Sequence, residues 1–446
     1  MNQTAPTVSV LTLGCRVNQY ESDALCAALK ANGVKIVPFG DPADAAVVNT
    51  CTVTGESDRK SRQMIRRAAQ NAAHVIVTGC FAQIAGDEIS SMEGVTFVCG
   101  NDGKANLAET VLAVLSGSLP VGVNGVTPPV GRGSVEMTLP SPQRTRSYIK
   151  IEDGCGNRCA YCLIRFARGP VRSKAREVVL SEARALAEAG AKEVILTGIE
   201  AASYGMDFEN RQPYGHALAD LIREVNRIPG ILRIGLGSLE PTVLSDYFAA
   251  AVRDSEKLLP HFHLSVQSGS TAVLRAMRRR YPAEAVLRSM ERIRSARPDV
   301  TFSADMIVGF PGETGEDYRL TEDFCRAAEF LHLHIFPFSR REGTEAASME
   351  NQVPEPVKRD RAERLEAVGA ETRRELLDRY VRDHGTTPVY LLVEKNGGGF
   401  LSGHSEHFVE LKKIPGRAAV GEVVPVLTDA TDGLVCTGHP AEGFGS

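Results

Sequence analysis

Residues 155–162 of this chain read Cys155-Gly-Asn-Arg-Cys159-Ala-Tyr-Cys162, so three thiols lie within one short segment. Three thiolates this close can hold three irons of a [4Fe-4S] cluster and leave the fourth iron without a protein ligand. An iron with an open position can bind a small molecule, by the same logic that keeps a catalytic zinc one ligand short. A zinc knuckle that lacks its fourth ligand is the alternative interpretation. The spacing predicts a cluster that binds a small molecule.

The cysteine motif follows the first strand of an alternating series of strands and helices. The predicted strands are residues 147–152, 193–197, 231–236, 263–266, 301–308 and 332–336, with helical patterns between them. Six strand–helix units predict a partial barrel, whose active site should lie at the C-terminal ends of the strands. We assign residues 144–375 to this domain.

The N-terminal part of the chain shows the same alternation. The predicted strands are residues 8–13, 45–48, 75–78 and 95–98, and the predicted helices are residues 21–30 and 58–73. This pattern predicts an α/β domain with a doubly wound parallel sheet over residues 1–115. Residues 116–143 are rich in Gly, Pro, Ser and Thr, which predicts a linker.

The C-terminal part of the chain no longer alternates between strands and helices. A long charged helix is predicted over residues 353–384, and short strands are predicted over residues 387–394, 407–411 and 422–429. Three consecutive glycines at 397–399 separate the first two of these strands. We therefore expect a small β-barrel domain over residues 376–446.

Composition limits where the protein works and what it binds. No apolar run reaches the ~20 residues that span a bilayer, and residues 8–13 are too short for a signal peptide, so we expect a cytoplasmic protein with no membrane partner. Thiols stay reduced there, so clustered cysteines indicate metal binding or catalysis. The net charge is −4, yet residues 144–176 hold nine basic and two acidic side chains, and residues 275–294 hold seven and two. These two segments favour a phosphate-rich partner.

A second set of cysteines is dispersed in the sequence but similarly placed. Cys15, Cys51 and Cys80 each follow one of the first three predicted strands. In a doubly wound sheet these positions converge at the C-terminal edge, where such folds bind ligands. The set therefore predicts a second three-thiolate site. Four other cysteines have no matching context and are interpreted as core or surface thiols, namely Cys26, Cys99, Cys325 and Cys436.

Together these segments resemble the radical S-adenosylmethionine (SAM) methylthiotransferase family. The resemblance rests on residues 13–22, 49–54, 78–80, 155–162, 167–174, 264–270, 305–313 and 336–344, and it covers almost the whole chain. The C-terminal part resembles a TRAM domain, a small β-barrel that grips tRNA in this family. One departure is Arg165, which stands where the family usually has proline. It leaves the cysteines intact and bears on the shape of the loop.

The resemblance implies a transferase whose cofactors are SAM and two [4Fe-4S] clusters. By resemblance, the cysteines of the 155–162 motif hold the catalytic cluster that cleaves SAM to a 5′-deoxyadenosyl radical. Cys15, Cys51 and Cys80 hold the cluster that delivers sulfur. One SAM methylates that sulfur, and the radical from a second SAM removes hydrogen from C2 of an adenine. The methylthio group then bonds to that carbon.

The residues around the cysteines are typical of the branch that acts on N6-threonylcarbamoyladenosine next to the anticodon of tRNA. The implied partners are a tRNA anticodon stem-loop, an electron donor such as flavodoxin or ferredoxin, and a source of sulfide. Three alternatives remain open. The substrate could be isopentenyladenosine in tRNA or an aspartate of a ribosomal protein, or the chain could be a tRNA-binding iron–sulfur protein without turnover.

Candidate binding residues lie near the predicted strand ends. The candidates for SAM are Tyr161, Ser238, Glu240, Gln267, Ser268, Phe338 and Ser339. Arg168, Arg172 and Lys174 form a cationic segment directly after the cluster motif. We expect one of these three to pair with the threonyl carboxylate of the substrate, because arginine favours charge-assisted carboxylate recognition, or else with a tRNA phosphate.

Overall fold

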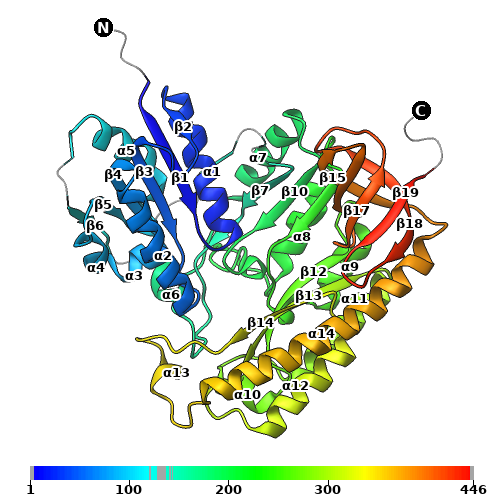
Figure 1. The fold of residues 1–446 in the computed structure, drawn as a ribbon. Coiled ribbons are helices and arrows are strands. Elements are labelled where there is room, and N and C mark those ends of the chain that lie inside the picture. The colour runs from blue at the N-terminus through cyan, green and yellow to red at the C-terminus, as the bar shows by residue number, and fades with distance from the viewer. Residues whose placement is uncertain (1–4, 120–121, 128–136, 140–141, 143, 442–446) are drawn as a thin grey trace.

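The computed structural model describes residues 5–119, 122–127, 137–139, 142 and 144–441. Figure 1 shows an N-terminal α/β unit in blue and cyan, a central unit of strands and helices, and a C-terminal barrel in orange and red on the far side of the central unit. Within these ranges, none of the helices combines the length and apolar character needed to cross a membrane.

The N-terminal unit is a six-stranded sheet in which all neighbouring strands are parallel. The strands, in their order across the sheet, are β2 (Lys35–Val37), β1 (Thr7–Thr12), β3 (Ala43–Thr50), β4 (Ala72–Gly79), β5 (Val95–Cys99) and β6 (Val123–Gly125). The predicted doubly wound sheet is confirmed. Strands β2 and β6 were not predicted, and β6 lies inside the predicted linker.

Helices cover both faces of this sheet. Val8, Val47 and Ile76 pack with α1 (Arg16–Ala31) and α5 (Leu107–Leu115) on one face. The opposite face packs against α2 (Gly55–Ala69), α3 (Cys80–Ile84) and α4 (Gly86–Ser90). Strands buried on both faces read as continuous apolar runs, which is why residues 45–48 were recognised as a strand.

The central unit is a partial barrel made of two parallel three-stranded sheets. One sheet contains β7 (Arg146–Lys150), β10 (Glu193–Thr197) and β11 (Arg233–Leu236), and the other contains β12 (His261–Gln267), β13 (Thr301–Val308) and β14 (His332–Pro337). Single bridges, Ile234 with Leu258 and Leu239 with Leu264, join the two sheets. The predicted partial barrel of six strands is confirmed.

The predicted strand 147–152 is divided in two. Strand β7 ends at Lys150, and β8 (Glu152–Asp153) pairs antiparallel with β9 (Arg172–Ser173). This second pairing brings the segment after the cysteine motif back beside the segment before it.

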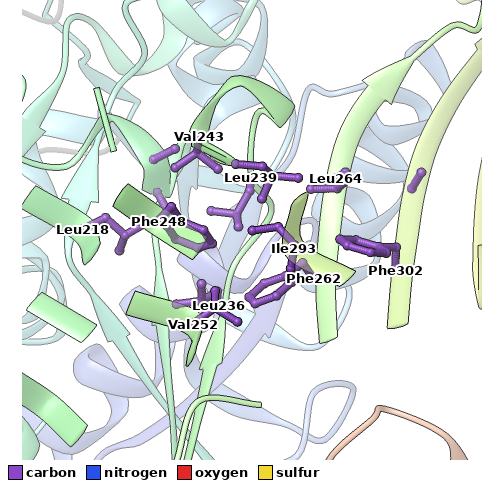
Figure 2. Close-up of a cluster of buried hydrophobic side chains, with 14 of the residues drawn as sticks. Leu218, Leu236, Leu239, Val243, Phe248, Val252, Phe262, Leu264, Ile293 and Phe302 are labelled. Atoms are coloured by element: carbon purple, nitrogen blue, oxygen red, sulfur yellow. The ribbon is translucent and has the colours of Figure 1, made fainter. Parts of the chain in front are cut away.

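Five main helices surround the strands: α7 (Arg176–Glu188), α8 (His216–Asn226), α9 (Asp246–Asp254), α11 (Ala283–Ala296) and α12 (Gly315–Ala328). Figure 2 shows part of the core that they enclose, where Phe248, Phe262 and Phe302 meet between helices and strands. The Phe248 and Phe262 rings lie edge to face with centroids 5.8 Å apart. Full burial of one such side chain stabilises the fold by about 1.5–3 kcal/mol.

The C-terminal unit begins after the long helix α14 (Glu355–His384), which crosses the predicted domain boundary at residue 375. Five strands close into a barrel: β15 (Val389–Gly397), β16 (Phe400–His404), β17 (Glu410–Pro415), β18 (Val423–Thr431) and β19 (Cys436–Pro440). The predicted small β-barrel is confirmed, although β16 and β19 were not predicted.

The C-terminal barrel packs against the beginnings of the central strands. Arg233, at the start of β11, donates a 2.7 Å hydrogen bond to the carbonyl of Tyr390. Thr301, at the start of β13, donates one of 2.7 Å to the carbonyl of His407. Since the cysteine motif follows a strand end, the C-terminal barrel and the motif occupy opposite ends of the central strands.

Candidate active site

The cysteine motif forms a loop between β8 and α6 (Ile164–Arg168). Gly154 begins the loop with φ +83°, and a Cβ there would lie 2.0 Å from the carbonyl oxygen of Pro170. Only glycine fits this close approach of two backbone segments. The amide of Cys155 donates to the carbonyl of Gly169 at 3.1 Å, which closes the loop. Arg165 lies in α6, where its guanidinium stacks on Phe166, so the loop forms without the usual proline.

Each sulfur of the motif accepts one N–H hydrogen bond. The backbone amides of Asn157 and Ile164 donate to the sulfurs of Cys155 and Cys162, both at 3.4 Å. The guanidinium Nη1 of Arg279 donates to the sulfur of Cys159 at 3.3 Å. Hydrogen bonds to sulfur stabilise thiolates and tune the potential of a cluster that they ligate. This donor set therefore fits an iron–sulfur cluster.

A cavity of about 300 Å³ opens beside the motif and is lined by all three of its cysteines. Five of the seven side chains predicted to bind SAM also line it, namely Tyr161, Ser238, Gln267, Phe338 and Ser339. Gln267 has φ +78° at a break in the register between β12 and β13. Such strain is costly for a non-glycine residue and occurs where a site requires it.

The other two predicted SAM ligands are directed into the protein. Ser268 is fully buried, and its hydroxyl lies 3.3 Å from that of Thr321. Glu240 is buried and accepts a 2.8 Å hydrogen bond from the side-chain amide of Asn157, beside the motif. Glu240 therefore orients the cysteine loop, and the prediction that Ser268 contacts SAM is not supported.

Glu200 lines the same cavity and was missed in the sequence, although it closely follows β10. Burial, followed by repulsion from Glu240, raises the pKa of Glu200 to about 7. Arg279 opposes this shift. A carboxyl with such a pKa can exchange its proton near neutral pH, so it can respond to a cationic ligand.

The second set of cysteines converges at the C-terminal edge of the N-terminal sheet, as predicted. Cys51 directly follows β3, Cys80 directly follows β4, and Cys15 precedes α1. Burial raises the pKa of Cys51 to about 11, and the neighbouring Cys80 and Cys15 shift it in the same direction. A Cβ on Gly14, where φ is +93°, would lie 2.7 Å from the sulfur of Cys51. The three thiols therefore share one small region.

The two sets of cysteines face each other. Burial raises the pKa of Cys162 to about 11, and both Cys159 and Cys80 of the N-terminal unit act in the same direction. A second cavity of about 860 Å³ is lined by Cys15 and Cys51. It shares with the first cavity the lining residues Val53, Thr54, Ser238, Asp305, Phe336, Pro337 and Ser339. The two cavities therefore adjoin, one beside Cys155, Cys159 and Cys162 and the other beside Cys15 and Cys51.

Neither set is arranged for a single ion. In the described part of the chain, no three His, Cys, Asp or Glu side chains are gathered closely enough to hold one metal ion. Zinc requires its ligands within about 2.3 Å of one point.

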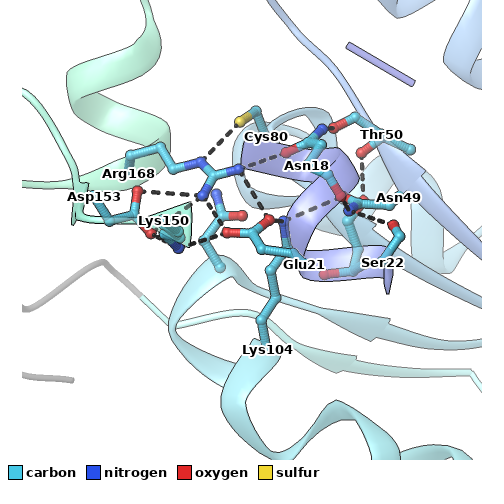
Figure 3. A network of polar contacts seen from close by, with 12 residues as sticks. Asn18, Glu21, Ser22, Asn49, Thr50, Cys80, Lys104, Lys150, Asp153 and Arg168 are labelled. Atoms are coloured by element: carbon cyan, nitrogen blue, oxygen red, sulfur yellow. Dashed lines mark hydrogen bonds and ion pairs between the residues drawn. The ribbon is translucent and has the colours of Figure 1, made fainter. Parts of the chain in front are cut away.

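Arg168 forms the centre of a buried ionic network between the N-terminal and central units (Figure 3). Its side chain is fully buried, and its Nη1 lies 2.6 Å from Glu21 and 3.2 Å from Asp153. Its Nη2 donates to the side-chain oxygen of Asn18 at 2.5 Å, and its Nε donates to the sulfur of Cys80 at 3.3 Å. No donor of Arg168 remains for a substrate.

Arg172 and Lys174 are engaged in the same way. Arg172 is buried and lies 2.5 Å from Asp102 of the N-terminal unit. Lys174 is buried, lies 2.7 Å from Glu182 and donates a 3.0 Å hydrogen bond to the hydroxyl of Tyr20 in the N-terminal unit. The structure directs all three cations at protein partners, so it does not support the predicted pairing of Arg168, Arg172 or Lys174 with a substrate carboxylate or a tRNA phosphate. These three cations hold the domains together instead.

Arg341 fixes the loop that follows Cys51. Its guanidinium donates to both the carbonyl and the hydroxyl of Thr52 and to a carboxylate oxygen of Asp58, each at 2.7 Å. The amide of Gly55 donates to the hydroxyl of Ser339 at 3.1 Å. The loop after β14 thus fastens the second set of cysteines to the barrel that carries the first.

Two family profiles match the chain. The uncharacterized protein family UPF0004 matches residues 7–100, and the radical SAM superfamily matches residues 149–325. Each match covers one of the two sets of cysteines.

The chain also resembles curated proteins over most of its length. It is 36% identical over 426 residues to the threonylcarbamoyladenosine tRNA methylthiotransferase MtaB of Bacillus subtilis (strain 168), which covers 94% of this chain and 93% of that protein. The protein of the same name from Thermotoga maritima is 36% identical, with 98% of both chains covered. A tRNA-2-methylthio-N(6)-dimethylallyladenosine synthase of Erythrobacter litoralis is 34% identical, with 81% of both covered.

Solved structures share the fold. The radical SAM methyltransferase TsrM from Kitasatospora setae superposes with a TM-score of 0.59 at 15% identity and covers 77% of each chain. The cobalamin-dependent SAM radical enzyme OxsB superposes with a TM-score of 0.53 at 11% identity, over 86% of this chain and 62% of that one. At these identities the likeness concerns the fold alone.

Proposed function

Because this chain belongs to the family of threonylcarbamoyladenosine tRNA methylthiotransferases, we propose that it inserts a methylthio group at C2 of N6-threonylcarbamoyladenosine next to the anticodon. As a member of that family the chain is a radical-SAM tRNA methylthiotransferase. Insertion at C2 would use two molecules of SAM and two [4Fe-4S] clusters. One observation carries the proposal: Cys155, Cys159 and Cys162 line one cavity, and Cys15 and Cys51 of the second set line a cavity that shares seven lining residues with it.

Each set has the donors that a cluster with one open iron needs. Cys155, Cys159 and Cys162 would hold the first cluster, and Cys15, Cys51 and Cys80 the second. The N–H groups directed at the sulfurs of both sets support this assignment. When bound, the clusters supply the electron that cleaves SAM to a 5′-deoxyadenosyl radical and the sulfur that is methylated and transferred.

The walls of the smaller cavity suit SAM. Phe338 packs edge to face on Phe310 with ring centroids 5.4 Å apart, so it forms a rigid apolar wall. Glu200 offers a carboxylate to the cationic parts of SAM, and Gln267 offers an amide held in a strained backbone conformation. Together these side chains would orient SAM against the open iron and limit the access of water.

The larger cavity suits a flat base. Val53 is 58% exposed and Phe336 is 39% exposed, and both line the two cavities. Large exposed apolar side chains inside a cavity mark a binding surface. Enzymes that modify a base read it by stacking it between apolar or aromatic side chains. We place the adenine here, so that C2 faces both sets of cysteines.

The partners follow from this chemistry. The tRNA anticodon stem-loop would reach the cavity with its loop and the C-terminal barrel with another part of the same molecule. A reduced flavodoxin or ferredoxin would supply the electron, and a separate sulfide source would replace the transferred sulfur.

Iron and sulfide counting under anaerobic conditions tests the proposal. The wild-type protein should hold about eight irons, and a Cys15→Ala/Cys51→Ala/Cys80→Ala variant about four. Nucleoside analysis of tRNA treated with each protein, SAM and a reductant should show the 2-methylthio product with the wild type alone. A count of about four irons in the wild type, or a methylthio group on isopentenyladenosine only, would overturn it.

A further inference from the structure

We infer that Arg16, which lines the larger cavity, binds the threonyl carboxylate of the substrate. This inference rests on the proposed function. N6-threonylcarbamoyladenosine carries a free carboxylate on its threonyl group, whereas a dimethylallyl group is neutral and apolar. An enzyme of this class therefore needs a cation near the adenine to favour the first substrate. Arg16 takes the role that the sequence analysis gave to one of Arg168, Arg172 and Lys174.

Arg16 lies in the wall of the larger cavity, beside the second set of cysteines. It follows Cys15 directly, and both residues line the cavity of about 860 Å³. Its side chain is partly exposed, in contrast to that of Arg168, which is fully buried. A substrate group in this cavity can therefore reach the guanidinium of Arg16 without rearrangement of the domain interface.

Most hydrogen-bond donors of the Arg16 guanidinium have no partner among the described residues. Its Nη1 donates one hydrogen bond of 3.2 Å to the carbonyl of Leu236, and no carboxylate pairs with it among the described residues. An arginine has five N–H donors in a planar fork that matches a carboxylate. Most of this fork remains available to a ligand.

The two carboxylates that line the larger cavity already have partners. Among the acidic groups, Asp305 lies 3.1 Å from His263, and Glu56 accepts two hydrogen bonds from Arg59. In the smaller cavity, Arg341 is bound to Asp58, and Arg279 donates to the sulfur of Cys159 and to the carbonyl of Ser265. Among the described residues that line the larger cavity, Arg16 is the one arginine or lysine, and it can bind an anion without displacing a carboxylate.

A pair of histidines lies near Arg16 in the larger cavity. His334 lines the same cavity, and its ring centroid lies 5.2 Å from that of His263. Burial and the charges of His263 and Arg16 lower the pKa of His334, although Asp305 opposes them. His334 is therefore neutral near pH 7, and the positive charge of this part of the cavity comes from Arg16.

Binding measurements on the full reconstituted protein test this inference. Three fluorescently labelled anticodon stem-loops would be compared: one with N6-threonylcarbamoyladenosine, one in which the threonyl carboxylate is replaced by a neutral amide, and one with unmodified adenosine. We expect the wild type to prefer the carboxylate over the amide by on the order of tenfold in Kd. Arg16→Gln should abolish this preference by weakening binding of the carboxylate RNA alone, and Arg16→Lys should retain part of it.

A matched control is Arg66→Gln, which removes an exposed arginine on α2 and should weaken all three RNAs equally or not at all. Equal weakening of the carboxylate and amide RNAs by Arg16→Gln would assign Arg16 to a tRNA phosphate or to structure and overturn the inference. So would an unchanged preference. Iron content and the unfolding midpoint identify a misfolded variant, and Arg16→Lys then supplies the comparison.

Failure of the inference is distinguishable from failure of the proposed function. If the wild type binds all three RNAs alike and forms no methylthio product on the first, the proposed function fails. If the wild type forms the product and prefers the carboxylate while Arg16→Gln does the same, only the role of Arg16 fails.

Discussion

The Nε of Arg168 donates a hydrogen bond of 3.3 Å to the sulfur of Cys80. Arg168 belongs to the segment after the first cysteine motif, and Cys80 belongs to the second set of cysteines in the N-terminal unit. One side chain therefore links the two proposed cluster sites. It also pairs with Glu21, a residue 147 positions earlier in the chain. The electronic environment of one site thus depends on the docking of the domain that holds the other.

Replacement of Arg168 by lysine should change the second cluster site. Lysine keeps the charge but lacks the planar fork, so the hydrogen bond to the sulfur of Cys80 is lost. Fewer hydrogen bonds to a thiolate lower the reduction potential of the cluster that it ligates. We expect a lower midpoint potential for one of the two EPR signals in a redox titration. Shifts of both signals by the same amount would contradict this prediction.

Gly14→Ala should displace Cys51. The new Cβ would lie 2.7 Å from the sulfur of Cys51, and the backbone φ of +93° adds strain of about 1–3 kcal/mol. We expect iron content to fall from about eight to about four. The matched control is Gly33→Ala, because Gly33 has a φ of +77° but no atom within 4 Å of the new Cβ. The prediction fails if both variants keep or lose iron equally.

Arg341→Ala should loosen the loop that follows Cys51. The substitution removes three hydrogen bonds and leaves the largely buried carboxylate of Asp58 without its cation. Breaking such a pair costs about 3–5 kcal/mol. Denaturant unfolding should show this loss, and iron content should drop. Arg340→Ala, which removes the adjacent exposed arginine, should leave both quantities unchanged. Equal stability of the two variants would count against the role of Arg341.

His332 should make the docking of the C-terminal barrel sensitive to pH. Burial, followed by the charges of Arg373, His334 and His404, lowers the pKa of His332 to about 3. The ring of Phe408, from the C-terminal barrel, packs against it with centroids 6.2 Å apart. An unfolded histidine binds a proton below about pH 6.5, whereas folded His332 stays neutral, so stability decreases as the pH falls from about 6.5 toward 3.

The expected loss is about 1 kcal/mol in the free energy of unfolding between about pH 7 and pH 5.5. His332→Gln should reduce the difference between urea unfolding curves recorded at these two pH values. His74→Gln, in the N-terminal sheet, serves as the control. If His332→Gln and the wild type lose the same free energy, His332 is not the titrating group.

The sequence was sufficient for the architecture and for the two sets of cysteines, because strand–helix alternation and the position of each cysteine after a strand are local signals. The six strands of the partial barrel were all recognised. Strand β6 was missed because Val123–Gly125 has no β-rich pattern and exists only through its pairing with β5. Strand β2 is equally short and lies at the edge of its sheet.

Side-chain roles were harder to predict, because they depend on partners that are distant in the sequence. Arg168 appeared available until the fold placed Glu21 and Asp153 against it. Ser268 follows a strand end, yet the bulge at Gln267 directs it toward Thr321 instead of the cavity. Arg16 lies within the motif of residues 13–22, but the sequence did not indicate that it binds a ligand. That inference rests on the lack of a carboxylate partner among the described residues, which no sequence pattern reveals.

The contact between Arg341 and Thr52 joins residues that are 289 positions apart. A ribosome makes about 5–20 residues per second, so roughly 15–60 seconds separate the synthesis of these two residues. During that interval the nascent N-terminal sheet can fold, but the loop after Cys51 lacks the hydrogen bonds from Arg341. Complete shaping of the second cluster site must therefore wait until the central barrel has left the ribosome. Iron loading of the proposed second site would accordingly be a late event in the maturation of the protein.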